Sequence, residues 1–193
     1  MSTEVCSKSA SQQCNEMLCL LEDATDKNYI GESVSQLAHA LQCAQLAVES
    51  GADDETVLAA LFHDIGHLCA DADERAERNT YGVMNHDMIG ADFLRQCGMS
   101  EKVCQLVLGH VEAKRYLTAI DPEYRTHLSD ASKMTLIAQG DGMRPEEVIA
   151  FEQDPLFDEK ILMRTWDEAA KVVDLAVPDL NTYRPLLFDH LTR

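Results

Sequence analysis

At 193 residues the chain has the length of one domain, and its hydrophobic fraction of 46% excludes wholesale disorder. Its 16 basic and 34 acidic side chains give a net charge of −18. That charge argues against general nucleic-acid binding and against docking on an anionic membrane, because both need a basic surface.

The seven cysteines point to reduced thiols, most of them small core residues. Their number is odd, and no two form the C-x-x-C pair of a zinc ribbon. They are Cys6, Cys14, Cys19, Cys43, Cys69, Cys97 and Cys104. No charged segment leads into an apolar run at the start, and no stretch approaches the roughly 20 apolar residues of a membrane span. We therefore expect a cytoplasmic protein.

Helical periodicity dominates the chain. Apolar residues repeat at three- and four-residue steps over 34–48, with Ser33 as the candidate N-cap and Gly51 as the candidate end. A second helix is predicted from about Asp53 into the segment His63-Asp64-Ile65-Gly66-His67. Further helices are expected at 85–96, 100–114, 129–138, 145–151 and 157–174.

Longer connections remain at 66–84 and 115–128, with a tail from residue 178, and no two-residue alternation marks a strand. Linkers, repeats and low-complexity tracts are also absent from the sequence. We therefore expect one all-α domain over 1–193, a bundle of roughly seven to nine helices.

The pair His63-Asp64 is the first candidate metal site. An imidazole and the adjacent carboxylate reach one cation only where the helix loosens, which Gly66 permits. Asp64 has two oxygens and can bridge two metals. Such a pair alone is often a simple cap, and one histidine among apolar neighbours is usually a core residue. Three more histidines on separate helical segments favour metal: His39, His86 and His110.

The order His, His-Asp, His, His, Asp resembles the HD-domain superfamily of all-α metal proteins, which implies an HD-domain helical bundle. In that family a late helical aspartate completes the site. The late acids that compete for this place are Asp141, Asp154, Asp158, Asp167 and Asp174. We choose Asp167, which follows Trp166 in the last long helix and shares a face with Arg164; the alternative is a solvated helix face.

Longer segments resemble the di-iron HD oxygenases that break the carbon–phosphorus bond of 1-hydroxy-2-aminoethylphosphonate or its trimethylammonio analogue. The resemblance covers about residues 25–180, so the first 20 or so residues and the C-terminal tail are expected to be peripheral. It is carried by Tyr29-Ile30-Gly31-Glu32-Ser33, Leu37-Ala38-His39, Ala60-Leu61-Phe62-His63-Asp64-Ile65-Gly66-His67, Asn85-His86, Gly109-His110-Val111-Glu112-Ala113-Lys114, Leu128-Ser129-Asp130-Ala131-Ser132 and Arg164-Thr165-Trp166-Asp167.

This resemblance implies two irons, a mixed-valent Fe(II)/Fe(III) pair, with dioxygen as co-substrate. Nitrogen and oxygen ligands suit iron. The implied ligands are His39, His63, Asp64 and Asp167 for one iron, and His86 and His110 for the second, with Asp64 bridging both.

The loop before the first ligand helix carries the family's tyrosine and glutamate. The resemblance makes Tyr29 a removable iron ligand, while Glu32 helps to displace it and holds the cationic end of the substrate. The alternative is an ordinary loop tyrosine and a first-turn acid that complements the helix dipole.

A phosphonate needs donors, and several side chains are candidates. Lys114 lies one turn after His110. His67 is interpreted as a donor to the substrate's hydroxyl or phosphonate. It is not assigned to a zinc-protease motif, because Gly66 interrupts the helix that such a motif needs. Family position and charge add Ser132, Gln139 and Arg164, whose guanidinium suits bidentate contacts. The alternative for each is a loop imidazole or a solvated surface group.

The segment Gln139-Gly140-Asp141-Gly142-Met143 departs from the Gln-Gly-Gly-Pro-Met of the family. Its extra carboxylate, Asp141, and the acidic balance favour a trimethylammonio substrate, converted to glycine betaine and phosphate; the unmethylated form would give glycine. The resemblance also implies an upstream hydroxylase in the same pathway.

Two other classes of protein remain as alternatives. One is an HD-type metal-dependent phosphohydrolase of nucleotides or phosphomonoesters, with Mn²⁺, Mg²⁺ or Fe²⁺ activating water. Tyr29 and Glu32 argue against it, because a hydrolase gains nothing from a ligand that caps an oxygen site. The other is a metal-free helical module that binds a protein partner.

Overall fold

The computed structural model describes residues 8–25, 32–69, 73–79 and 82–193. Across these residues it contains eleven α-helices, nine of them with eight residues or more, which confirms the all-α prediction. The helices are α1 (Ala10–Glu22), α2 (Gln36–Glu49), α3 (Asp54–Phe62), α4 (Gly66–Cys69), α5 (His86–Gln96), α6 (Glu101–Ile120), α7 (Tyr124–His127), α8 (Asp130–Ala138), α9 (Pro145–Glu152), α10 (Phe157–Ala169) and α11 (Arg184–Leu191).

Strand structure among the described residues is limited to one short hairpin. β1 (Arg78–Asn79) pairs antiparallel with β2 (Gly82–Val83), and Arg78 lies opposite Val83. This hairpin was not predicted, because strands of two residues are too short to show an alternating pattern. The hairpin leads directly into α5 and its first residue, His86.

Several helix ends differ from the expected ones. The N-cap of α2 is Ser35 rather than Ser33, since the Ser35 hydroxyl accepts the backbone N–H of Ala38 at 3.1 Å. Helix α6 continues to Ile120, six residues beyond the expected end, and α10 stops at Ala169. Gly51 ends the α2 region with φ of 74°, as its position predicted.

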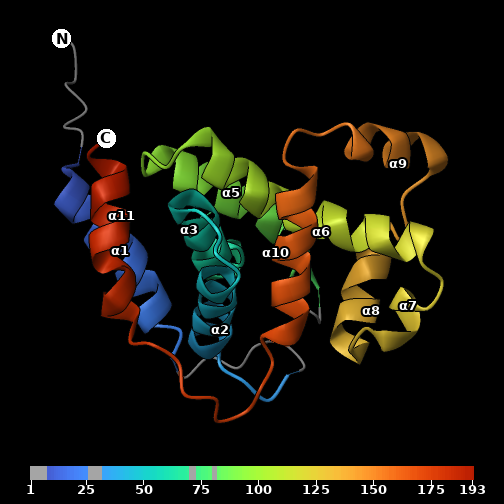
Figure 1. Ribbon diagram of the computed structural model, residues 1–193, viewed down its shortest axis with the longest axis horizontal. Helices are drawn as coiled ribbons and strands as arrows, with labels where there is room; N and C mark the ends of the chain where they lie inside the picture. The colour runs from blue at the N-terminus through green and yellow to red at the C-terminus, as the bar shows by residue number, and fades with distance from the viewer. Residues whose placement is uncertain (1–7, 26–31, 70–72, 80–81) are drawn as a thin grey trace.

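Helix α1 was not expected, and neither was α11 in the C-terminal tail. The sequence did hold a signal for α1: Ser9 and Gln12 form a capping box at its start. Its side chains Cys14, Met17 and Leu18 are at most 1% exposed. Helices α1 and α11 lie side by side (Figure 1). Both segments therefore contribute to the main core.

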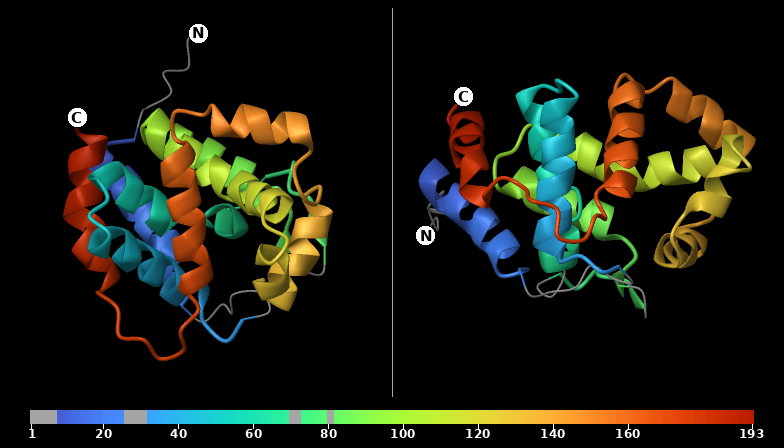
Figure 2. Two further views of the ribbon diagram at one scale, coloured as in Figure 1. Left: turned by 45° about the vertical axis from the view of Figure 1, so that its right-hand side comes forward. Right: turned by 60° about the horizontal axis from the view of Figure 1, so that its bottom comes forward.

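The middle of the molecule is built from α2, α3, α5, α6 and α10. Helix α2 packs on α3, α5 packs on α6, and α10 packs against both α6 and α2 (Figures 1 and 2). Helices α7, α8 and α9 gather around the C-terminal end of α6 (Figure 1). The four histidines expected to bind metal lie on or beside α2, α3, α5 and α6, so the packing of these helices decides the site.

Gly66 brings α4 against the start of α5. A Cβ atom built on Gly66 would lie 1.8 Å from the backbone oxygen of His86 and 2.8 Å from the backbone nitrogen of Gly90. The glycine is therefore required by close backbone approach, in addition to the looseness that the sequence analysis assigned to it. This contact sets the position of His86.

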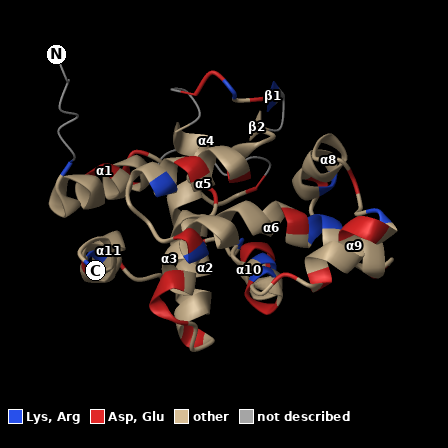
Figure 3. Ribbon diagram, turned by 90° about the horizontal axis from the view of Figure 1, so that it is seen from above, with Lys and Arg blue, Asp and Glu red and all other residues tan. Residues whose placement is uncertain are grey.

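The acidic residues are distributed over several helices, α9 among them, rather than gathered on one face (Figure 3). None of the helices in the described parts of the chain is both long and apolar enough to cross a membrane.

Candidate metal centre

Four buried histidines form two facing pairs in the middle of the bundle. The Nε2 atoms of His39 and His63 are 3.1 Å apart, and those of His86 and His110 are 2.9 Å apart. Exposure of these side chains does not exceed 8%. Two nitrogens that bind one ion at about 2.1 Å and roughly at right angles lie about 3 Å apart. The spacing of each pair thus fits a metal ion.

Backbone carbonyls fix which ring nitrogen faces the centre. The Nδ1 atom of each histidine lies 2.6–2.9 Å from a backbone oxygen, and a carbonyl can only accept, so Nδ1 carries the proton. The acceptors are Ala170 for His39, Ala60 for His63, Val83 for His86 and Val107 for His110. The Nε2 atom is therefore the nitrogen of each ring that faces the centre, and the ring orientation is held.

Asp64 spans the two pairs. Its Oδ1 lies 3.3 Å from His86 Nε2 and 3.5 Å from His110 Nε2. Its Oδ2 lies 3.3 Å from His63 Nε2 and 3.7 Å from His39 Nε2. Each oxygen thus faces a different histidine pair, which is the arrangement a bridging carboxylate needs.

Asp167 completes the first pair from α10. Its Oδ1 lies 3.4 Å from His39 Nε2 and is buried without a hydrogen bond from the described residues, while its Oδ2 accepts from Arg164 Nη1. Burial opposes ionisation of Asp167, but the charge of Arg164 holds the pKa of its carboxyl well below the usual value. A buried, ionised and incompletely paired carboxylate beside imidazoles fits a metal ligand.

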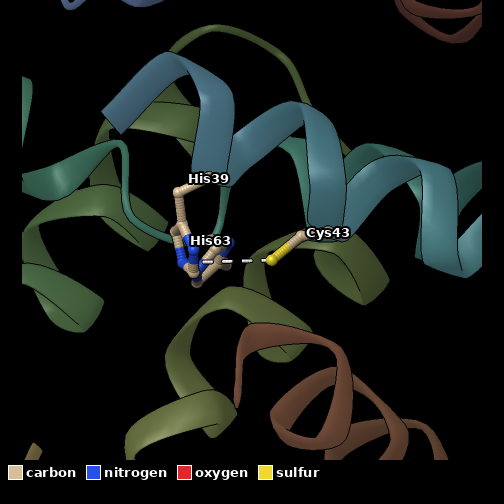
Figure 4. Close-up of side chains that lie close together, drawn as sticks. All are labelled: His39, Cys43 and His63. Carbon is tan, nitrogen blue, oxygen red and sulfur yellow. Dashed lines mark hydrogen bonds between the residues drawn. The ribbon is translucent and has the colours of Figure 1, made fainter. Parts of the chain in front are cut away.

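Cys43 is a neighbour of this pair that the sequence analysis did not single out. Figure 4 shows His39 and Cys43 on one helix, both pointing towards His63. The Cys43 Sγ lies 3.9 Å from His39 Nε2. Burial raises the pKa of its thiol well above 9, with the nearby charge of Asp167 adding to the effect. A thiol that stays protonated is a poor ligand, so the carboxylates are the better partners for His39 and His63.

Next to the candidate metal ligands lies a cavity of about 50 Å³, lined by side chains of both signs. Lys114 is 4% exposed and donates to Thr135 Oγ1 at 3.1 Å. Burial, together with the charge of Arg164, lowers the pKa of Lys114 to about 7. An anion bound in the cavity would favour its protonated form.

His67 also lines this cavity, and its ring stacks on His86 with centroids 4.0 Å apart. Its Nδ1 is buried and has no hydrogen-bond partner among the described residues. Burial and the charge of His86 lower the pKa of His67 to about 3, so the ring is neutral at physiological pH. It therefore offers a substrate one donor or acceptor.

The chain matches the HD-domain family over residues 37–150. It is 38% identical over 181 residues to the uncharacterized protein L432 of Acanthamoeba polyphaga mimivirus, covering 94% of this chain and 83% of the relative. It is 37% identical over 177 residues to hydroxymethylphosphonate dioxygenase of Gimesia maris (92% and 87% covered). It is 38% identical over 162 residues to [1-hydroxy-2-(trimethylamino)ethyl]phosphonate dioxygenase (glycine-betaine-forming) of Leisingera caerulea (84% and 82% covered).

The chain belongs to the HD-domain phosphonate oxygenases. It is accordingly an O₂-dependent oxidoreductase, and the resemblance seen in the sequence is confirmed. Two groups of side chains in this oxygenase could hold a metal ion, His39, Cys43 and His63 in one and Asp64, His86 and His110 in the other, and Asp167 on α10 lies beside the first.

Most of the predicted substrate residues of this oxygenase line the cavity. They are Glu32, His67, Lys114, Ser132 and Arg164. Tyr29 lies outside the described residues. Gln139 donates to the backbone oxygen of Met84 at 3.2 Å and is not among the described residues that line the cavity.

Asp141 is not brought to the cavity either. Its Oδ1 lies 2.9 Å from Nη1 of the exposed Arg125 and accepts the N–H of Gly142. The other late acids also lie elsewhere: Asp154 pairs with Lys160, and Asp158 and Asp174 are exposed. Of the five competing acids, only Asp167 lies against the histidines.

Sequence reasoning missed three residues that line the cavity, namely Gln36, Ala131 and Thr135. It also missed the groups that hold Arg164. Tyr124 and Glu168 both contact its guanidinium, with Arg164 Nε 2.9 Å from the Tyr124 hydroxyl and Nη2 2.7 Å from Glu168 Oε1. The i, i+4 spacing of Arg164 and Glu168 was a usable signal, while Tyr124 lies 40 residues away in the chain.

Proposed function

We propose that the chain is a di-iron oxygenase that uses O₂ to cleave the carbon–phosphorus bond of a 1-hydroxyphosphonate. The single observation that carries the proposal is that Asp64 faces two histidine pairs, each with the spacing of one metal site, beside a cavity with buried cationic side chains. The names of two relatives, both phosphonate dioxygenases, support the same chemistry.

In this proposal His39, His63, Asp64 and Asp167 hold one iron, and His86, His110 and Asp64 hold the other. The iron pair, when bound, would supply the redox chemistry that lets O₂ oxidise C1. Backbone carbonyls keep the four imidazoles oriented, and Arg164 keeps Asp167 ionised. The protein thus contributes a fixed set of ligands and a shielded cavity.

The residues that line the cavity would bind the substrate. Lys114 and Arg164 offset the charge of a phosphonate within a chain whose net charge is −18. Ser132 adds a hydroxyl, and the unpaired nitrogen of His67 meets the substrate's C1 hydroxyl or a phosphonate oxygen. The balanced reaction converts one 1-hydroxyphosphonate and one O₂ into one carboxylic acid and one phosphate.

The trimethylammonio substrate favoured by the sequence rested on Asp141 and on the acidic balance. Because Asp141 pairs with Arg125 outside the cavity, that residue does not support it. We therefore propose the 1-hydroxyphosphonate class. A hydroxylase that supplies the C1 hydroxyl is the implied partner. A reducing compartment such as the cytoplasm suits the six described cysteines, all of which are free.

The test is phosphate release from hydroxyphosphonates under air and under nitrogen, with the iron-loaded protein. The expected result is one phosphate per O₂ consumed and no release without O₂. Release that persists under nitrogen would instead support the phosphohydrolase alternative. Elemental analysis should find about two irons per chain; a metal-free protein would support the non-catalytic helical module.

A further inference from the structure

Lys171 follows the end of α10 and lies where the backbone is held on both sides. The preceding carbonyl, of Ala170, accepts from His39 Nδ1 at 2.8 Å. The following residue, Val172, exchanges two hydrogen bonds with the side chain of Gln42, at 2.9 and 3.0 Å. The attachment point of the Lys171 side chain is thus fixed relative to the metal centre.

The ammonium of Lys171 joins two walls of the cavity. Its Nζ lies 3.3 Å from Glu32 Oε1 and 3.5 Å from Ser132 Oγ. Glu32 and Ser132 both line the cavity. The side chains of Lys171 and Glu32 are each 16% exposed, so their charges are only partly screened by water.

This contact changes what Glu32 can do. A carboxylate without an ion-pair partner at this position would attract a cationic group on the substrate, whereas the carboxylate of Glu32 already forms an ion pair with Lys171. A substrate ammonium would have to displace Lys171 or lie beside a like charge, and separating a partly buried ion pair is costly. A phosphonate without a cationic substituent meets no such penalty.

We infer that Lys171 is a specificity-determining residue that neutralises Glu32 and makes the enzyme prefer 1-hydroxyphosphonates whose carbon substituent carries no positive charge. This inference rests on the proposed function. It assigns Lys171 a role in positioning and selectivity, without contact to the reacting atoms.

The experiment compares kcat/KM of the iron-loaded enzyme for hydroxymethylphosphonate and for 1-hydroxy-2-aminoethylphosphonate. The wild type is expected to prefer the former by at least tenfold. In Lys171→Gln the ratio should move at least tenfold towards the ammonium substrate, a change of about 1.4 kcal/mol. Lys171→Arg keeps the charge and should keep the wild-type ratio.

Two controls separate selectivity from general damage. Lys133→Gln changes a lysine on α8 that donates to the Thr126 backbone oxygen, and it should leave both substrates unaffected. In a Glu32→Gln background, Lys171→Gln should no longer favour the ammonium substrate, because the carboxylate it exposes is gone. Iron content and thermal unfolding of each variant check that it is folded and loaded.

Three results would overturn the inference: a wild type that prefers the ammonium substrate, a Lys171→Gln variant with an unchanged ratio, or one that loses both activities equally. The wild-type measurement decides even when a variant does not fold. If no hydroxyphosphonate is oxidised under air, the proposed function itself fails, which is a different outcome from turnover with the wrong selectivity.

Discussion

Replacing Gly66 by alanine tests whether the close approach of α4 to α5 positions the second histidine pair. The new Cβ would lie 1.8 Å from the backbone oxygen of His86, where real Cβ contacts are not shorter than 3.0 Å. The two atoms nearest to this Cβ are backbone atoms of His86, so no side-chain rotation relieves the clash. The two helices must separate by about 1 Å or more.

Overpacking of this kind costs about 1–3 kcal/mol. For a chain of this length, about 2–4 °C is lost per kcal/mol, so the Tm of Gly66→Ala should fall by roughly 2–12 °C. Because His86 moves with its backbone, iron content should fall from about two per chain towards one. Differential scanning calorimetry and elemental analysis measure the two effects.

Gly142→Ala is the matched control. Its Cβ would meet Ala119 at 3.7 Å, an ordinary contact, and its expected effect stays within about 0.5 kcal/mol. Without a clash, Gly66→Ala would raise stability by up to about 1 kcal/mol, because alanine is the better helix former. An unchanged or higher Tm with full iron content would falsify the reasoning.

Three further predictions concern other residues. Asp64→Ala should leave at most one metal per chain by elemental analysis, since one carboxylate serves both pairs; two retained irons would refute the bridge. Glu168→Gln should raise KM for the phosphonate more than it lowers kcat, because Arg164 loses a partner that holds its guanidinium. A fall in kcat with an unchanged KM would contradict this. Burial lowers the pKa of His190, so below pH 6.5 the unfolded chain takes up a proton that the folded His190 does not, and stability falls as the pH drops, by at most about 1.4 kcal/mol per unit. His190→Gln should flatten this slope between pH 6.5 and 5 in thermal unfolding, and an identical slope would show that His190 does not contribute.

The set of four candidate histidine ligands could be predicted from the sequence because each histidine occurs on its own apolar helical segment. Spacing along the chain therefore predicted that His39, His63, His86 and His110 could meet. The choice of Asp167 among five late acids needed the family resemblance. The structure supports this choice by placing Asp167 Oδ1 3.4 Å from His39 Nε2.

What the sequence could not predict depends on contacts between distant segments. The ion pair between Glu32 and Lys171 joins residues 139 positions apart, and Tyr124 contacts Arg164 across 40 positions. The prediction that Asp141 contacts a substrate ammonium rested on its departure from the family segment. In the structure Asp141 pairs instead with the exposed Arg125. No periodicity or spacing rule encodes such partners.

The carbonyls that orient the histidines have a consequence for the order in which the centre can assemble. His63, His86 and His110 each donate to the carbonyl three residues earlier, so one turn of chain is enough to orient the ring. His39 instead depends on Ala170, 131 residues further along. During folding, the pair formed by His86 and His110 can be ready once residues 83–110 have packed. The pair that contains His39 has to wait until the end of α10 is in place.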